Sequence, residues 1–304
     1  MPISEAGGSF GALWILASAA FLSLYDLAKK ASVRENAVLP VLLISTIFGC
    51  AAFAGSLLLT GNLMAVVGAM DGRVVVLASL KSLIVATSWI FTFCALRTLP
   101  VTIATPIRAS APALVFLVAL VLYGETPTLL QGFGMSLVFA GYWAFSWAGR
   151  HEGIDFLRSR AVWFALAGAF LSACSALFDK YVFQVAAAPV ESVQLLFQIG
   201  LVLVYAVCLA VCRFFSTSSP ALSRPFDWRW TIPLIGVFLA GADWLYFRGL
   251  AIPGVPISIA SLMRRFSVVL TFAIGAFVFH ETNLRRKSLA LVSVVLGVAL
   301  LCLV

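Results

Sequence analysis

Long apolar stretches alternate with short polar connections along almost the whole chain. A helix needs about 20 predominantly apolar residues to cross a membrane. Stretches of this kind run over residues 10–28, 37–60, 73–97, 101–123, 128–148, 161–186, 190–214, 230–252, 256–279 and 286–304. The pattern therefore predicts an all-α integral membrane protein with about ten transmembrane helices and no separate soluble domain.

The composition agrees with this pattern. The chain has 304 residues, of which 62% are hydrophobic and 11% are charged, whereas soluble domains are about 45–50% apolar and about 25% charged. The formal net charge of +8 comes from basic residues in the short connections, where they act as orientation signals. No basic domain or RNA-binding motif accompanies them, so nucleic acid is not an expected partner.

The connections after odd-numbered helices are the basic ones, whereas the others hold little beyond Arg73. Their basic residues are Lys29, Lys30, Arg34, Arg97, Arg150, Arg158, Arg160, Arg213, Arg224, Arg229, Arg285, Arg286 and Lys287. The positive-inside rule predicts that these connections are cytoplasmic and that both termini lie outside. We expect a multi-pass protein of the bacterial inner membrane, and the lack of a basic segment before the first helix predicts that no signal peptide is cleaved.

The two halves of the chain resemble each other. An offset of 156 residues places identical residues at six positions, pairing Arg108 with Arg264, Phe116 with Phe272, Glu125 with Glu281, Thr126 with Thr282, Val138 with Val294 and Gly141 with Gly297. The repeat predicts two five-helix units, residues 1–149 and 158–304. An odd number of helices inverts the second unit, and inverted repeats are typical of secondary transporters with a substrate site near the midplane.

Short motifs at matching places in each half carry a family resemblance. Gly124-Glu125 is followed by Gly141, and His280-Glu281 by Gly297, while Pro112 precedes the first motif. The chain resembles the drug/metabolite transporter superfamily, EamA type, over nearly its whole length. It departs from that family in having Val268 where the second half would match Pro112, and in its many intramembrane basic residues. The resemblance implies export of small organic metabolites, amino acids among them, and cytoplasmic termini, contrary to the charge pattern.

Ionisable residues within the apolar stretches are the candidate substrate-binding groups, because a charge in the hydrocarbon usually faces a cavity or a partner. In the first half, Lys81 shares a helix face with Ser88, and Trp89 adjoins that face. Arg108 lies on the face of Pro112, which frees a backbone carbonyl.

In the second half, Asp179 continues a serine stripe, and Asp243 lies well inside its helix. Two aromatic residues near Asp243, Trp244 and Tyr246, match Trp89 and Phe91 of the first half. Arg264 and Arg265 point about 100° apart, so we expect one to face the cavity and the other an acidic partner or the interface.

Two interpretations of these charges remain open. As ion pairs they would hold helices together, each cation locked to an acid such as Asp179 or Asp243. As a binding site, the surplus of cations would favour an anion or the carboxylate of a zwitterion. In that case Lys81, Arg108 and Arg265 would converge on a central cavity lined by Trp89 and Trp244.

A secondary transporter that works by alternating access, by export or exchange, is the favoured function. Small-molecule substrate, membrane lipids and either protons or a counter-substrate are the expected partners, for a monomer or a homodimer. No GxxxxGK[ST] motif is present, so ATP is not an expected energy source, and we expect no cofactor. The alternatives are a flippase for a lipid or lipid-linked head group, an integral membrane enzyme and a non-transporting scaffold.

Other reactive residues have structural interpretations. Glu125 and Glu281 lie beside turns, where acids cap helices or sit at the interface, so no catalytic role is expected. His151 and His280 are isolated in the sequence, and the six cysteines lie within apolar stretches. We therefore expect no metal site.

Overall fold

Every regular element that the structure describes is helical. The computed structural model describes residues 3–33, 36–98, 115, 121, 124, 128–147, 160–214, 225–267, 270–271, 274, 292–297 and 299–300. The helices are α1 (Ile3–Val33), α2 (Val38–Leu59), α3 (Leu63–Gly68), α4 (Gly72–Thr98), α7 (Leu129–Trp147), α8 (Arg160–Lys180), η1 (Tyr181–Val185), α9 (Val190–Phe214), α10 (Thr231–Leu250) and α11 (Ile257–Arg264).

Most of the predicted membrane helices are confirmed within this part of the chain. Five segments are long and apolar enough to cross a membrane: Gly11–Lys29, Val38–Leu59, Gly72–Thr92, Arg160–Val185 and Val190–Phe214. Helices also occupy the predicted stretches 128–148, 230–252 and the start of 256–279. The stretch 101–123 lies almost wholly outside the described residues. The protein is thus an all-α, multi-pass integral membrane protein, in which helices satisfy their own backbone hydrogen bonds within lipid.

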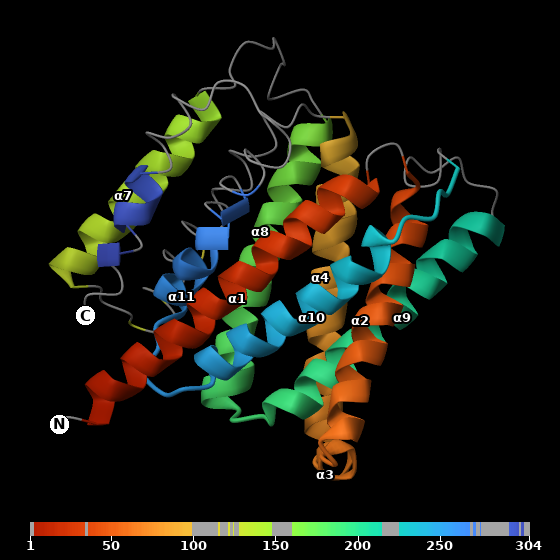
Figure 1. The fold of residues 1–304 in the computed structure, drawn as a ribbon, viewed down its shortest axis with the longest axis horizontal. Helices are drawn as coiled ribbons and strands as arrows, with labels where there is room; N and C mark the ends of the chain where they lie inside the picture. The colour runs from red at the N-terminus through yellow and green to blue at the C-terminus, as the bar shows by residue number, and fades with distance from the viewer. Residues whose placement is uncertain are drawn as a thin grey trace.

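Successive helices of each half run in alternating directions. In Figure 1, α1, α4 and α9 rise from the lower edge, whereas α2, α8 and α10 descend from the upper edge. At the upper edge, the helix ends carry Lys29, Arg160 and Arg213, and Arg229 precedes α10. We call this edge the basic end, and the opposite edge, with α3 and η1, the far end. The predicted orientation would make the basic end cytoplasmic.

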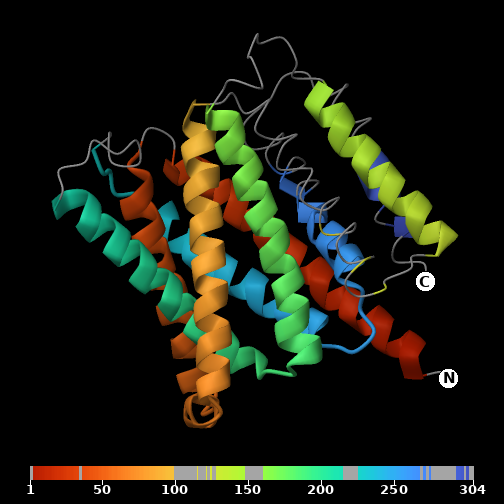
Figure 2. The same ribbon diagram turned by 180° about the vertical axis from the view of Figure 1, so that it is seen from behind.

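The closest helix packing joins the two halves of the chain. The helix α1 lies along α10, and α4 lies along α8, as the front and back views show (Figure 1 and Figure 2). The helix α10 also packs on α2, while α4 packs on α9. The helices α1, α2 and α4 of the first half correspond to α8, α9 and α10 of the second half. Under this correspondence, the α1–α10 contact is equivalent to the α4–α8 contact, and the α2–α10 contact is equivalent to the α4–α9 contact.

Glycine makes one of these crossings possible. Where α2 and α10 cross, a Cβ atom on Gly236 would lie 1.7 Å from the carbonyl oxygen of Ser45, and one on Gly49 would lie 2.7 Å from that of Gly236. Only a residue without a side chain lets the two backbones approach this closely.

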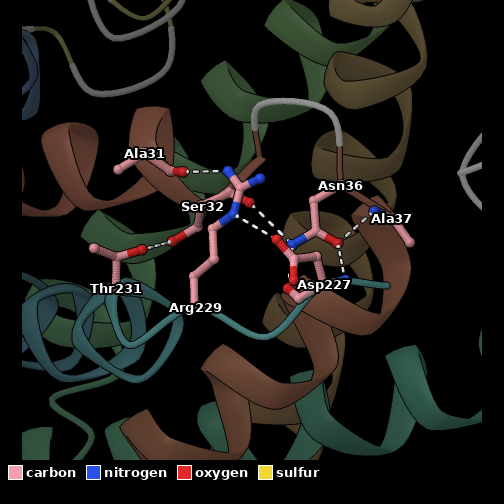
Figure 3. Close-up of polar contacts among 7 residues, drawn as sticks. All are labelled: Ala31, Ser32, Asn36, Ala37, Asp227, Arg229 and Thr231. Atoms are coloured by element: carbon pink, nitrogen blue, oxygen red, sulfur yellow. Dashed lines mark hydrogen bonds and ion pairs between the residues drawn. The ribbon is translucent and has the colours of Figure 1, made fainter. Parts of the chain in front are cut away.

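A polar cluster joins the two halves at the basic end (Figure 3). The Asn36 side chain donates to the carbonyl of Asp227 at 2.6 Å and accepts from its N–H at 2.9 Å. Arg229 donates to the carbonyl of Ala31 at 2.7 Å, and the hydroxyls of Ser32 and Thr231 form a hydrogen bond. These bonds fix the α1–α2 connection to the segment that leads into α10.

Candidate functional site

The first part of the site lies between α4 and α8. Lys81 of α4 forms a buried ion pair with Asp179 of α8, and the Ser88 hydroxyl donates to the carbonyl of Gly168 at 2.8 Å. The Lys81 ammonium also lies 4.4 Å from the ring centroid of Phe247 and 4.8 Å from that of Phe197. The lysine is therefore held by one carboxylate and by two aromatic faces, which attract a cation through their quadrupoles.

The second part of the site lies between α10 and α11. Arg264 forms an ion pair with Asp243, and its guanidinium lies 4.4 Å from the ring centroid of Tyr246. Asp243, Tyr246 and Phe247 share one face of α10 because they follow each other at intervals of three and four residues. This face therefore connects the two ion pairs, since Tyr246 lies against Arg264 and Phe247 against Lys81.

These groups line one cavity of about 300 Å³. The side chains come from α1, α4, α8, α9, α10 and α11, and so from both halves of the chain. The charged members of the lining are Asp26, Lys29, Lys81, Asp179, Asp243, Arg264 and Arg265. The described lining thus has four cations against three acids, a formal surplus of one positive charge.

The lining becomes more exposed toward the basic end. At the level nearest the far end, Lys81, Asp179, Phe197 and Phe247 are all buried, with Lys81 only 2% exposed. Toward the basic end, Asp26, Lys29 and Thr92 are partly exposed. Within the described part of the chain, the cavity therefore has a floor at the buried Lys81–Asp179 pair, and its lining is more exposed toward the basic end.

Most of the predicted site residues meet in this cavity. Its lining includes Lys81, Ser88, Trp89, Asp179, Asp243, Tyr246, Arg264 and Arg265. The ion pairs of Lys81 and Arg264 show that both cations have an acidic partner, as the packing interpretation expected. Arg264 faces an acidic partner, Asp243, as was expected of one of the two arginines, and both arginines line the cavity. Arg108 lies outside the described residues, as do Glu125, Glu281, His151 and His280.

The structure does not bring Trp244 to the cavity. Its indole N–H donates to Glu191 at 3.4 Å, and its ring packs edge-on against Trp14. Trp244 follows Asp243 directly, so its side chain points about 100° away around the helix. The expectation that Trp244 lines the cavity is therefore wrong for this structure.

Sequence reasoning missed several lining residues. Asp26 was not among the predicted site residues, yet it lines the cavity with Leu22, Tyr25 and Lys29. These four positions follow the i, i+3, i+4, i+7 spacing of one helix face, so this signal was present in the sequence. No comparable signal identified Phe197 and Phe247, because apolar rings are common on every membrane helix.

Comparisons with known proteins agree with this fold. The profile of the EamA-like transporter family matches residues 9–147. A solved structure titled "Crystal structure of protein" is 19% identical, with a TM-score of 0.76 over 96% of this chain and 96% of that chain. At this identity the likeness shows the fold alone. No curated protein matches the sequence.

Proposed function

Because the chain belongs, through residues 9–147, to the EamA-like transporter family, we propose that it moves a small anionic or zwitterionic, amino-acid-like metabolite across the membrane. Transport proceeds by alternating access, as export or exchange, in the bacterial inner membrane. Protons or a counter-substrate drive it, and the protein acts as a monomer or a homodimer.

The observation that carries this proposal is the charged cavity that both halves of the chain line. Arg264 and Arg265 present guanidinium groups, which bind a carboxylate through charge-assisted and bidentate hydrogen bonds. Asp179 and Asp243 supply acceptors for an amine, and Trp89 and Tyr246 supply aromatic walls. A zwitterion matches this mixture better than a simple anion does, because the cationic surplus of the described lining is a single charge.

The size of the cavity favours a small metabolite over a lipid-linked head group. Ligand pockets range from about 300 to 1,000 Å³, and this cavity, at about 300 Å³, is at the lower limit. A flippase for a lipid or a lipid-linked sugar remains the second candidate, since its substrate would extend laterally beyond the cavity.

The exchange of contacts between the halves supports the proposal that residues 1–149 and 158–304 are inverted repeats. Helices at matching places in the two halves run in opposite directions in Figure 1. In the first pair α1 rises and α8 descends, and in the second pair α4 rises and α10 descends. In transporters built in this way, the substrate lies between the repeats, and one bundle of helices moves against another to expose it to either side in turn.

The test uses the purified protein in two assays. Thermal unfolding in detergent is first measured against a panel of amino acids, organic anions and phosphorylated metabolites, because a ligand that binds the native state raises its stability. Proteoliposomes then measure counterflow of the compound that stabilises. We expect an amino acid or a related zwitterion to do both, and Arg265→Gln to weaken its binding about 10–100-fold.

The matched control is Arg213→Gln, because Arg213 is exposed at the end of α9, outside the cavity lining. This variant should bind and transport as the parent does. If Arg265→Gln and Arg213→Gln behave alike, the cavity is not the binding site. If protein-only liposomes transport no compound of the panel, the proposed substrate class is wrong.

A further inference from the structure

The helix α8 does not end as an ordinary α-helix. Its last turn, η1, is a π-helix, with the N–H of Ala186 bonded to the carbonyl of Tyr181 at 2.7 Å. Two residues beyond its end, Ala187 has a φ of 48°, in the left-handed region that favours glycine. Single π-turns often mark functional sites, and a strained backbone persists only where surrounding contacts hold it.

Gln184 provides such contacts. From η1, its side-chain amide donates to the carbonyl of Leu250 and to that of Val255, each at 2.9 Å. The first carbonyl belongs to the last residue of α10, which packs on α1, and the second belongs to the α10–α11 connection. The Gln184 side chain therefore connects the end of α8 to the packed helices α1 and α10 at the far end.

Aromatic rings fill the space between these bonds and the cavity floor. Phe183 of η1 packs on Phe247 of α10 with 4.8 Å between the ring centroids, and Phe197 of α9 packs edge-on against the same ring. Phe247 also lies against Lys81. All three rings are buried, so they close the cavity floor from the far end.

We propose that η1 and the α10–α11 connection form the far-end gate of the transport cycle, with Gln184 as its latch. The inference rests on the proposed function, since a gate has a purpose only if the cavity opens at both ends. In the structure the gate is closed. Opening it separates Gln184 from the two carbonyls and Phe183 from Phe247, and connects the cavity to the far side.

The test measures opening without any substrate. All six cysteines are replaced, and Val255→Cys introduces one thiol at a buried position in the gate. In sealed proteoliposomes, a membrane-impermeant maleimide then labels this thiol from the far side only when the gate opens. We expect Gln184→Leu to speed labelling about tenfold or more, because two hydrogen bonds that favour the closed form are lost.

A second variant should act in the opposite direction. Ala187→Gly removes the steric cost of the left-handed conformation in the closed gate, so labelling should slow several-fold. The control is Gln131→Leu, at the start of α7, where Gln131 contacts only the local turn at Thr128 among the bonds described. It should leave the labelling rate unchanged.

The outcomes separate this inference from the proposed function. Equal labelling rates in the parent, Gln184→Leu and Ala187→Gly proteins would overturn the latch, and counterflow by the same vesicles would show that transport itself stands. If Gln184→Leu lowers the unfolding temperature, its faster labelling could come from lost stability, and the Ala187→Gly protein then provides the test. If the Ala187→Gly protein is not labelled more slowly than the parent, the latch is overturned. Faster labelling of Gln184→Leu at an unchanged unfolding temperature supports the gate.

Discussion

The Lys81–Asp179 pair should be the most strongly coupled pair of charges in the described part of the chain. The side chains are 2% and 6% exposed, respectively. Removing one partner of such a pair leaves the other buried and uncompensated, at a cost of about 3–5 kcal/mol in unfolding free energy. Lys81→Met keeps an unbranched side chain of similar volume, and Asp179→Asn keeps the shape of the side chain, so each variant removes charge with little change in volume.

The double variant should be far more stable than the sum of the single losses predicts. Once Lys81 is Met and Asp179 is Asn, no buried charge is left without a partner. The coupling energy of the cycle should therefore be at least about 2 kcal/mol. Unfolding of the purified protein in mixed micelles of increasing SDS content measures all four free energies.

The exposed pair of Arg229 and Asp227 is the matched control. Its atoms are 3.2 Å apart, but the side chains are 31% and 65% exposed, and exposed pairs contribute about 0–1 kcal/mol. For Arg229 and Asp227, the losses of the two single variants should add up to the loss of the double variant within about 0.5 kcal/mol. If the losses for Lys81 and Asp179 are additive in the same way, the buried pair does not hold α4 to α8 and the reasoning fails.

Two further predictions concern contacts between the halves. Gly236→Ala should lower the unfolding free energy by at least about 3 kcal/mol, because the new Cβ atom meets the backbone of α2. Its control is Gly55→Ala, since no atom lies within 4 Å of the Cβ position of Gly55. This variant should leave the unfolding free energy unchanged or raise it by up to about 1 kcal/mol. Asn36→Ala should cost about 2–3 kcal/mol, because the N–H and carbonyl of Asp227 lose their partner, whereas Asn62→Ala, at an exposed site, should cost less than about 0.5 kcal/mol. The same SDS titration measures all four variants, and equal losses within either pair would contradict the corresponding argument.

The helices of this protein could be predicted from the sequence because lipid imposes one requirement on every span. Any stretch of about 20 apolar residues must satisfy its backbone internally, and a helix does so whatever its neighbours are. Features that depend on neighbours were not predictable. The π-turn of η1 is one example, since its contacts through Gln184 lie 66 and 71 residues away in the chain.

In the candidate site too, features of a single helix were predictable and contacts between helices were not. Helix geometry placed Lys81 and Ser88 on one face, and the structure confirms that both line the cavity. It could not say that Lys81 would pair with Asp179, 98 residues away, because the packing of α4 on α8 decides this. The error over Trp244 arose from judging a residue by its neighbour Asp243, although adjacent residues on a helix face different directions.

The placement of the ion pairs bears on which contacts can break during transport. Lys81 and Asp179 belong to α4 and α8, while Asp243 and Arg264 belong to α10 and α11, beside α1. Neither pair crosses between these two groups of helices. If the groups move relative to each other, neither of these two buried ion pairs has to separate, and a cost of several kcal/mol is avoided. In the described part of the chain, the contacts that cross at the far end are two hydrogen bonds of Gln184, the packing of aromatic rings and the contact of Lys81 with the Phe247 ring. Such contacts are individually weak, so a gate placed there can open while each ion pair keeps its partner.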